Sequence, residues 1–289
     1  MYYFLTFGGG DIDYLNGVKE LTEQAETLNI FYKIIGLTDI DLKNDNEFWN
    51  KHGTFILENI RGYGYWIWKP YIIKKYINLI EENDTLLYLD CGCKFNNITY
   101  KDKLIELLKM EKNDILINLC GSNDCTYTKK DVSKSFNLSI DLLKKPHGQA
   151  GVVFYKKTTK IIEFVDQWYE LCQNYHNIDD SPSIIENFDG FIEHRHDQSI
   201  FNLLIKKNGL YDNNFFEQGI NFPIIIKRIK YPDNCINCRK KDIIHNKTKL
   251  CDECKTQIFC KKCIKCNERM IVFKKKNYVT NVIKHNLLN

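Results

Sequence analysis

The sequence lacks any long apolar run. No stretch of its 289 residues approaches the roughly 18 uncharged apolar residues of a membrane-spanning helix, so we expect no transmembrane segment. Residues 1–8 also lack the basic start and long apolar core of a secretion signal, which predicts a soluble, cytoplasmic protein. An internal repeat is missing too. Because 44% of the residues are hydrophobic, the chain can bury one sizeable core and a small satellite.

A strong excess of one charge is absent from the whole chain but not from its parts. The net charge is +4, yet residues 227–289 hold 17 Lys and Arg against 5 Asp and Glu, and residues 1–226 are net acidic. This asymmetry indicates two parts. The basic segment is either a solvated lysine surface or a binding segment for an anionic partner, such as nucleic acid, an anionic glycan or a donor phosphate.

Strands and helices are predicted to alternate along residues 1–230. Apolar, β-branched or aromatic runs predict strands at 1–6, 31–36, 85–89, 115–119, 151–155 and 222–229. Helical spacing predicts helices at 15–28, 104–110, 161–175 and 198–206, and a turn followed by a helix over 61–80. The alternation indicates an α/β fold with helices on both faces of a sheet. We expect the site at the carboxyl ends of the strands, near Leu5, Leu89 and Val153.

One buried strand ends in a carboxylate. Residues 86–93 read Leu-Leu-Tyr-Leu-Asp-Cys-Gly-Cys, which places Asp90 at the C-terminal rim of the sheet. A nucleotide-sugar diphosphate needs its charge neutralised as it leaves, and a Mn²⁺ or Mg²⁺ ion held by Asp90 would bridge protein and phosphate oxygens. The alternative is that Asp90 only caps a turn, as Asp often does after a strand.

A string of aromatic residues lies between two cations at 61–70, which read Arg-Gly-Tyr-Gly-Tyr-Trp-Ile-Trp-Lys-Pro. Aromatic faces suit uracil and the apolar face of a hexose, and the flanking cations suit phosphate. The alternative is an aromatic core cluster, which accounts for Trp66 or Trp68 but explains the flanking cations less well. The candidate donor-binding residues are Thr6, which follows Leu5, together with Arg61, Tyr65, Trp66, Lys69 and Asp90.

Two further polar motifs precede predicted elements. Residues 193–201, Glu-His-Arg-His-Asp-Gln-Ser-Ile-Phe, lead into a helix. Asp197 is either the N-cap of that helix or a catalytic carboxylate, and His196 and Gln198 are further catalytic candidates, as a base and as a carboxamide near the anomeric carbon. Residues 146–151 are interpreted as a substrate loop in which Gly148 and Gln149 bind the acceptor.

The motifs at 61–70, 88–93, 148–151 and 194–199 resemble, in content and order, those of a GT-A-like glycosyltransferase family found in bacterial polysaccharide clusters and large DNA viruses. The resemblance covers residues 1–230. It implies a GT-A fold, a UDP-sugar donor, a glycan or glycoprotein acceptor and a divalent cation near Asp90; for a viral protein the location would be the host cytoplasm. The family's usual Asp-x-Asp is incomplete, because Cys91 and Gly92 follow Asp90. Asp90 would therefore need a second ligand such as His194 or His196.

Seven cysteines crowd into residues 235–266, mostly as Cys-x2-Cys pairs. Such pairs suit tetrahedral zinc, since two thiolates two residues apart can hold one ion from a tight turn. The predicted ligands of about two structural zinc ions are Cys235, Cys238, Cys251, Cys254, Cys260, Cys263, Cys266 and His245. The spacing resembles ZZ-type modules. By that pattern Cys235, Cys238, Cys260 and Cys263 share one ion, and Cys251 and Cys254 hold the other with two of Cys266, His245 and His285.

The sequence thus predicts a GT-A-like domain at 1–232, a zinc module at 233–268 and a basic tail at 269–289. The predicted function is transfer of a sugar from a UDP-sugar to a glycan or protein. The alternative is a factor that binds nucleic acid or protein through its zinc module, on a non-catalytic α/β scaffold. Hydrolysis of the nucleotide-sugar without an acceptor stays open as a third interpretation.

Overall fold

The computed structural model describes residues 1–96, 98–212, 214–216 and 222–226, and the backbone of 259–260, 270–275 and 278–284. The chain divides into two compact units, Met1–Arg228 and Ile229–Asn289. Within the described ranges, no helix has the length and apolar character needed to cross a membrane. The predicted zinc ligands lie outside the described residues, apart from the backbone of Cys260, so the zinc module stays a prediction.

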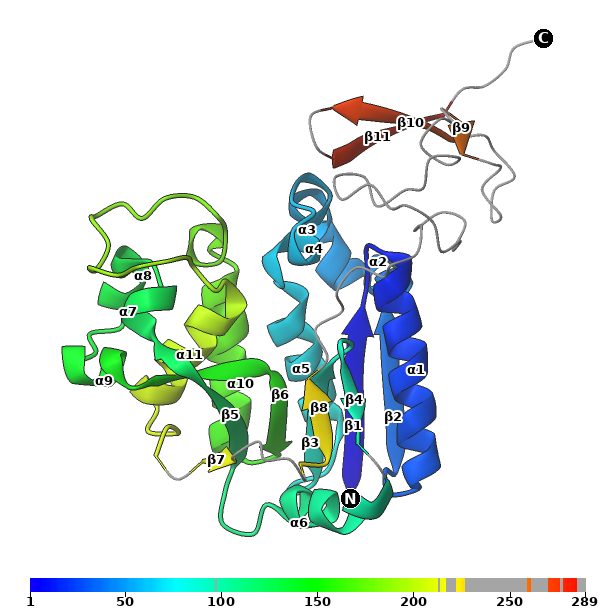
Figure 1. Cartoon of the computed structure of the whole chain (residues 1–289), viewed down its shortest axis with the longest axis vertical. Helices are drawn as coiled ribbons and strands as arrows, with labels where there is room; N and C mark the ends of the chain where they lie inside the picture. Colours follow the sequence, from blue (N-terminus) through cyan, green and yellow to red (C-terminus); the bar gives the residue numbers. More distant parts are fainter. Residues whose placement is uncertain are drawn as a thin grey trace. The chain divides into compact units, whose positions relative to one another are not determined.

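The first unit is built on a six-stranded sheet in the order β2-β1-β3-β6-β5-β7 (Figure 1). Its strands are β1 (Tyr2–Gly8), β2 (Lys33–Thr38), β3 (Thr85–Asp90), β5 (Ile115–Asn123), β6 (Pro146–Lys156) and β7 (Phe215–Phe216). β1 is parallel to β2 and β3, and β5 is parallel to β7, whereas β6 is antiparallel to both β3 and β5. Beside this sheet, β4 (Cys93–Phe95) pairs with β8 (Ile224–Ile226).

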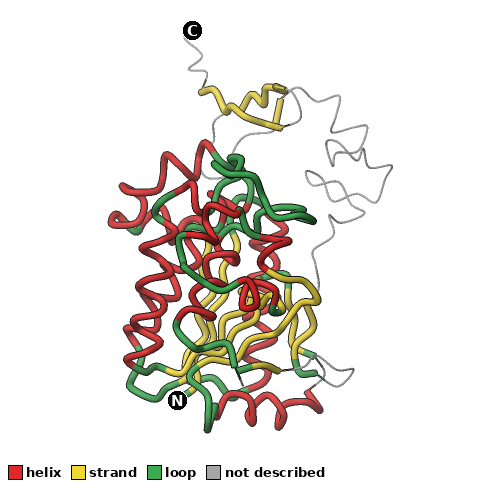
Figure 2. Tube along the Cα trace, turned by 90° about the vertical axis from the view of Figure 1, so that its left-hand side faces the viewer, coloured by secondary structure: helices red, strands yellow, loops and turns green. Residues whose placement is uncertain are grey.

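Helices are packed around the strands (Figure 2). On one face, α5 (Trp68–Leu79), α10 (Thr159–Cys172) and α11 (Asp197–Lys207) contribute to one hydrophobic cluster, and on the other, α1 (Ile12–Leu28) and α6 (Lys101–Lys109) contribute to a second. The predicted α/β architecture with helices on both faces is therefore confirmed. The remaining helices are α2 (Asp39–Asn44), α3 (Asn46–Glu58), α4 (Gly62–Tyr65), α7 (Asp124–Tyr127), α8 (Lys130–Lys134) and α9 (Ile140–Lys144), with 3-10 turns at Ile98–Tyr100 and Tyr175–Asn177.

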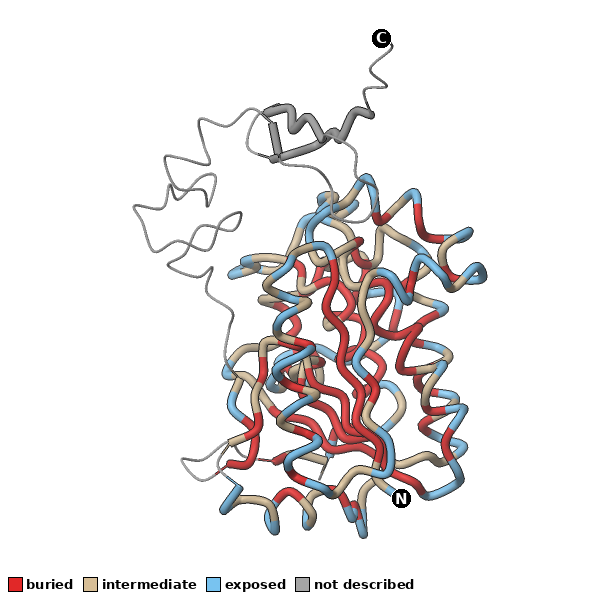
Figure 3. The backbone as a smooth tube through the Cα atoms, turned by 90° about the vertical axis from the view of Figure 1, so that its right-hand side faces the viewer, coloured by how far each residue is buried: buried red, intermediate tan, exposed pale blue. Residues whose placement is uncertain are grey.

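The alternation of side chains along the strands decides which residues face the site. In β3, Tyr88 packs into the cluster formed with α5 and α11, while Leu87 and Leu89 pack into the opposite cluster. Successive strand residues point to opposite faces, so Asp90 lies on the same face as Tyr88. Figure 3 shows that buried residues are concentrated in the strands of the sheet. Asp90 is thus presented toward α5 and α11.

Within the second unit, β9 (Phe259–Cys260), β10 (Met270–Lys275) and β11 (Tyr278–Lys284) form an antiparallel sheet in the order β11-β10-β9. Two of these strands fall within residues 269–289, the range that the sequence analysis assigns to a basic tail.

Candidate active site

The candidate site is a buried lysine between two carboxylates. Lys69 lies in the first turn of α5, Asp90 ends β3, and Asp197 begins α11. The Lys69 ammonium is 3.0 Å from Asp90 Oδ1 and 3.7 Å from Asp197 Oδ2. The side chains of Lys69 and Asp197 are 5% and 4% exposed, whereas that of Asp90 is 42% exposed. Asp90 is therefore the carboxylate of this group that a substrate can reach.

The carboxylates keep Lys69 charged inside the protein. Burial lowers the pKa of Lys69, but Asp197 and Asp90 outweigh burial, so the pKa lies above its ordinary value. Burial, aided by repulsion from Asp90 and opposed by Lys69, raises the pKa of Asp197 to about 7. With Lys69 positive and Asp90 negative, the group is neutral when Asp197 is protonated and carries one negative charge when Asp197 is ionised.

A left-handed turn precedes Lys69. The five consecutive residues 62–66 all have φ between 50° and 82°. The amides of Tyr65 and Trp66 donate to the carbonyls four residues earlier, at 2.8 and 3.1 Å. Left-handed helical geometry disfavours L-residues by roughly 1–2 kcal/mol each, so Gly62 and Gly64 lower the strain of this turn.

The turn holds His196 against the site. The imidazole of His196 stacks on the rings of Tyr65 and Trp66, with centroids 5.2 and 5.1 Å apart. The backbone of His196 has φ 54° and ψ −130°, an unusual conformation for a residue with a side chain, and it caps α11 without a side-chain hydrogen bond. The interpretation of Asp197 as the N-cap is therefore wrong, because His196 occupies that position and Asp197 is the first helical residue.

Arg61 is ion-paired rather than free for phosphate. Its Nη1 contacts both carboxylate oxygens of Asp180, at 2.9 and 3.0 Å, and its Nη2 lies 3.6 Å from Glu193. Asp180 and Glu193 belong to the connection 173–196 between α10 and α11. The buried Lys129 anchors this connection, through bonds to the carbonyl of His176 and to Asp179 Oδ1. An anion at Arg61 would have to displace its two acidic partners.

Residues 146–151 are not a loop, and this prediction is wrong. They form the first half of β6, and the register with β5 shifts there, so that Ile117 pairs with Val153 and Asn118 with Gln149. The shift leaves residues 150–152 without β5 partners, as in an extended β-bulge. A Cβ on Gly151 would overlap Asp90 Oδ2. The glycine therefore makes room for the exposed carboxylate of the site.

Three predicted contact residues lie away from the Lys69 group. Thr6 is fully buried, and because its neighbours Leu5 and Phe7 face the α5 side, its own side chain faces the opposite one. Gly148 is an interior residue whose amide and carbonyl both bond to Asn202. Gln149 Oε1 accepts from Asn118 Nδ2 at 3.0 Å. The predicted contacts of Thr6 with the donor and of Gly148 and Gln149 with the acceptor stay predictions.

A divalent cation would find an accessible carboxylate oxygen here, Asp90 Oδ2, since Oδ1 already contacts Lys69 and Tyr88. The described part of the chain contains no group of three His, Cys, Asp or Glu side chains able to hold a metal. His194 does not serve as the second ligand, since its Nδ1 accepts from the Lys129 amide at 3.2 Å and its Nε2 bonds to Asn177 O at 2.7 Å. The free Nε2 of His196 lies 3.9 Å from Asp180. A single carboxylate, with phosphates and waters, suffices for many Mg²⁺ sites, so Asp90 fits as an anchor.

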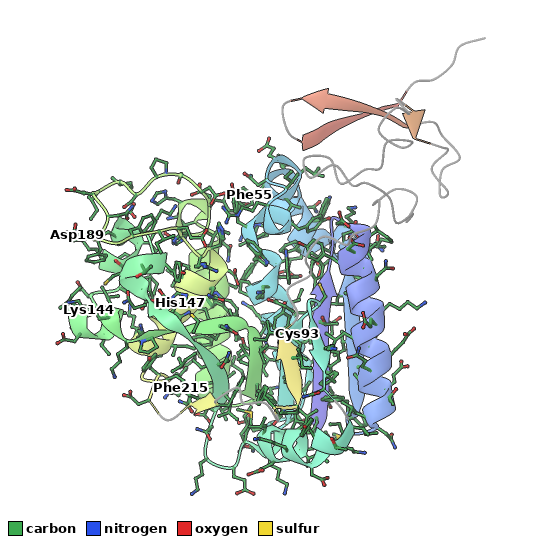
Figure 4. All side chains as sticks on the ribbon, in the orientation of Figure 1. Phe55, Cys93, Lys144, His147, Asp189 and Phe215 are labelled. Carbon is green, nitrogen blue, oxygen red and sulfur yellow. The ribbon has the colours of Figure 1, made fainter. Side chains whose placement is uncertain are left out.

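The sequence reading missed Tyr88 and the acidic partners of Arg61. The Tyr88 hydroxyl donates to Asp90 Oδ1 at 2.7 Å. Its position two residues before Asp90 on a strand was a usable signal, because such residues share a face. Asp180 lies in an irregular segment, where no periodicity could have predicted its place. Figure 4 shows Phe55 near the end of α3 and His147 near the start of β6.

No protein-family model matches the sequence, and no curated protein is significantly similar to it. Among solved structures, the apo form of mouse xyloside xylosyltransferase 1 is 10% identical, with 74% of this chain and 84% of that chain covered and a TM-score of 0.39. The apo glycosyltransferase GlyE of Streptococcus pneumoniae TIGR4 is 14% identical, with 75% of this chain but only 45% of that chain covered and a TM-score of 0.38. The galactosyltransferase LgtC is 14% identical, with coverages of 71% and 70% and a TM-score of 0.34.

All three neighbours are glycosyltransferases. At such low identities and scores they resemble this chain in outline only, so its function must be inferred from its own side chains.

Proposed function

We propose that the protein is a GT-A-type glycosyltransferase that moves a sugar from a nucleotide-sugar, with UDP as the nucleotide, to a glycan or protein acceptor. The observation that carries this proposal is the Lys69 ammonium held between Asp90 and Asp197 at the carboxyl end of β3. Ligands of open α/β sheets bind beyond that end. A fixed cation beside an accessible carboxylate suits a reaction in which a diphosphate leaves with growing negative charge.

The proposed roles follow from exposure. Lys69 supplies positive charge toward the departing phosphate oxygens, Asp90 meets the substrate, and the buried Asp197 holds Lys69 in place. Tyr65 and Trp66 are half-buried, so part of each ring remains available to a uracil or sugar face while the other part holds His196. In the transfer, the bond from the anomeric carbon to the phosphate oxygen breaks, the bond to an acceptor oxygen forms, and the acceptor hydroxyl proton leaves to solvent.

A Mn²⁺ or Mg²⁺ ion, when bound, would neutralise phosphate charge at this rim. Asp90 Oδ2 would hold it, because Oδ1 already contacts Lys69 and Tyr88. Lys69 would share the neutralisation, so we expect a cation to strengthen nucleotide binding rather than to be its sole requirement.

The test is a thermal-shift screen of UDP-, GDP-, CMP- and TDP-sugars with Mn²⁺, with Mg²⁺ and with EDTA, followed by assay of released nucleotide. A ligand at 100 times its Kd stabilises the native state by about 2.7 kcal/mol, which is readily measured. Asp90→Asn should abolish nucleotide release, while Asp102→Asn, an exposed carboxylate on α6, should not. If no nucleotide-sugar stabilises the protein or is consumed, glycosyl transfer is the wrong assignment.

We also propose that the cysteine-rich segment binds zinc and, with the basic residues around it, docks an anionic acceptor or partner. The support is the Cys-x2-Cys spacing and the excess of Lys and Arg in 227–289. The alternative function, a binding factor on a non-catalytic scaffold, is supported only by this segment. It gives no reason for a buried lysine between carboxylates, so the transferase is favoured.

A further inference from the structure

Arg195 is a partly exposed cation that the fold holds against α7. It lies two residues before Asp197, in the segment that leads into α11. Its backbone amide donates to the carbonyl of Tyr127 at 3.0 Å and to Ser199 Oγ at 3.1 Å. The guanidinium carbon Cζ lies 4.1 Å from the centroid of the Tyr127 ring, a cation–π contact. Backbone and side chain of Arg195 are therefore both fixed on the same residue of α7.

A carboxylate accompanies this cation. Arg195 Nε lies 2.9 Å from Glu193 Oε1, and the two side chains are 32% and 40% exposed. This contact is an ion pair without hydrogen-bond geometry, since Arg195 Nε has no hydrogen-bond partner within the described ranges. A guanidinium carries five N–H donors, and a carboxylate only accepts. In the part of the chain that the structure describes, neither group forms a hydrogen bond, so both remain available to a ligand.

Arg61 shows the contrast. Its Nη1 donates to both carboxylate oxygens of Asp180, and its Nη2 lies 3.6 Å from Glu193. Arg61, Asp180, Glu193 and Arg195 together have no net charge. A phosphate or carboxylate would meet two exposed carboxylates here, which disfavours an anion. A sugar hydroxyl both donates and accepts, so it suits a carboxylate and a guanidinium that lie side by side.

The pair formed by Glu193 and Arg195 lies close to Asp197. Because consecutive Cα atoms are 3.8 Å apart, the Cα atoms of Arg195 and Asp197 are no more than about 7.6 Å apart. His196 packs on the left-handed turn 62–66, whereas Arg195 packs on Tyr127 of α7, which follows β5 (Figure 1). The turn holds the proposed contacts to the donor. The α7 side therefore remains for the acceptor.

We propose that Glu193 and Arg195 bind a neutral sugar ring of the acceptor, with Arg195 donating to one hydroxyl and Glu193 accepting from its neighbour. This rests on the proposed glycosyl transfer and narrows the acceptor to a glycan whose ring at this site is uncharged. Tyr127 keeps the guanidinium in place before the sugar arrives, which lowers the conformational entropy that binding costs.

The test uses the full-length protein, the nucleotide-sugar that stabilises it most, and methyl glycosides as acceptor probes. The neutral probes are the methyl glycosides of glucose, galactose, mannose, xylose and N-acetylglucosamine, and the anionic ones are those of glucuronic and galacturonic acid. We expect the wild type to glycosylate at least one neutral probe, with a kcat/KM about tenfold or more above that for either uronic acid, because burying a carboxylate beside Glu193 leaves like charges in contact.

Arg195→Gln removes the charge and most of the donors. We expect the KM for the best neutral probe to rise about tenfold or more, the usual loss for a hydrogen bond to a charged group, with a smaller change in the KM for the nucleotide-sugar. Glu193→Gln removes the repelling carboxylate, so the preference for neutral over anionic probes should narrow by about threefold. Lys130→Gln removes another cation that lies over an aromatic ring, that of Phe188, and should change neither KM.

An unchanged KM for the neutral probe in folded Arg195→Gln, or a wild type that prefers a uronic acid, would overturn this acceptor site alone. So would a wild type that consumes the nucleotide-sugar without glycosylating any neutral probe. The comparison of probes on the wild type stands even if a variant does not fold. Failure of the wild type to bind or consume any nucleotide-sugar would overturn the transferase assignment and this inference with it.

Discussion

Lys69 Nζ lies 3.0 Å from Asp90 Oδ1 with its side chain only 5% exposed, while Lys74 and Lys75 on the same helix are 39% and 46% exposed. Lys69 is therefore buried, whereas Lys74 and Lys75 are exposed to water. Removing an ion from water costs several kcal/mol of free energy. A buried charge such as that of Lys69 must therefore be stabilised by oppositely charged partners. The Lys69–Asp90 pair is therefore both the electrostatic centre of the site and a condition for its folding.

Lys69→Met should destabilise the protein by about 3–5 kcal/mol, because removal of one partner leaves Asp197 buried next to Asp90 without a cation. The measurement is urea unfolding at pH 8, where the loss is largest. Lys74→Met is the control on the same helix. Its exposed pair with Asp166 should contribute only about 0–1 kcal/mol. Equal stabilities for the two variants would show that the Lys69 charge is not needed.

Gly151→Ala tests whether the β6 bulge clears space for Asp90. The added Cβ would overlap Asp90 Oδ2, so the carboxylate must turn away from its present position. We expect turnover to fall at least tenfold, while the fold loses only about 1–3 kcal/mol by local overpacking. Gly121→Ala on β5, where a Cβ meets nothing within 4 Å, should change neither quantity. Normal turnover in Gly151→Ala would mean that Oδ2 is not the working atom.

Gly64→Ala tests the left-handed turn. Gly64 has φ 82°, and a Cβ there would collide with Ile56, so the variant meets both backbone strain and a steric clash. Gly209 has φ 62° and open space around it. Gly209→Ala therefore measures the cost of left-handed backbone strain alone, about 1 kcal/mol of the free energy of unfolding. Chemical denaturation should show a clearly larger loss for Gly64→Ala. A comparable loss for both would show that the turn relaxes without displacing its aromatic rings.

The elements with strong periodicity were predictable. β3 ends at Asp90 as expected, and the helix after Asp197 follows from its apolar spacing. The convergence of Lys69 with these two carboxylates was not predictable, because it depends on α5 and α11 packing on the same sheet face. Nothing in residues 61–70 distinguishes a lysine that neutralises a phosphate from one that is already paired.

Two local misreadings have physical reasons. The glycines of residues 148–151 indicated a loop, yet both lie inside β6: Gly148 pairs with Leu119 and adjoins Asn202, and Gly151 lies in the register shift beside Asp90. α3 was missed because Trp49, Phe55 and Leu57 are apolar residues outside its buried face, which is formed by Phe48, His52 and Ile56, and they obscure the helical spacing. Its Asp45 N-cap, which accepts from the Phe48 amide, was the available signal.

The zinc prediction concerns residues outside the described ranges. Purified protein should contain about two zinc ions per chain by elemental analysis, held by the cysteines of 235–266. Cys251→Ser should lower the content to about one ion, because it removes a ligand of a single site. Cys120→Ser, which alters a free cysteine of the first unit, should leave it unchanged. Zinc-free protein, or equal loss in both variants, would contradict the module.

The final prediction concerns pH and Asp197, whose pKa is raised to about 7, first by burial and then by Asp90. The folded state holds this proton more tightly than the unfolded chain, so Asp197 contributes stability at low pH that is lost as pH rises toward 7. Nucleotide affinity should fall around pH 7, because ionisation of Asp197 in the folded state changes the Lys69 group from neutral to negative and repels the diphosphate. The loss of stability between pH 4 and 7 and the loss of affinity around pH 7 share one cause, the raised pKa of Asp197.

Asp197→Asn removes that titration while keeping the shape of the side chain. In this variant, the affinity for UDP, measured from pH 5.5 to 8.5, should lose its fall near pH 7, and the free energy of unfolding should lose its decline between pH 4 and 7. Asp180→Asn is the control, since its carboxylate is 42% exposed and pairs with Arg61 instead of Lys69. A merely structural Asp197 would lower stability without altering the pH dependence of binding. A wild-type profile retained in Asp197→Asn would assign the titration to another group and remove Asp197 from the electrostatics of the site.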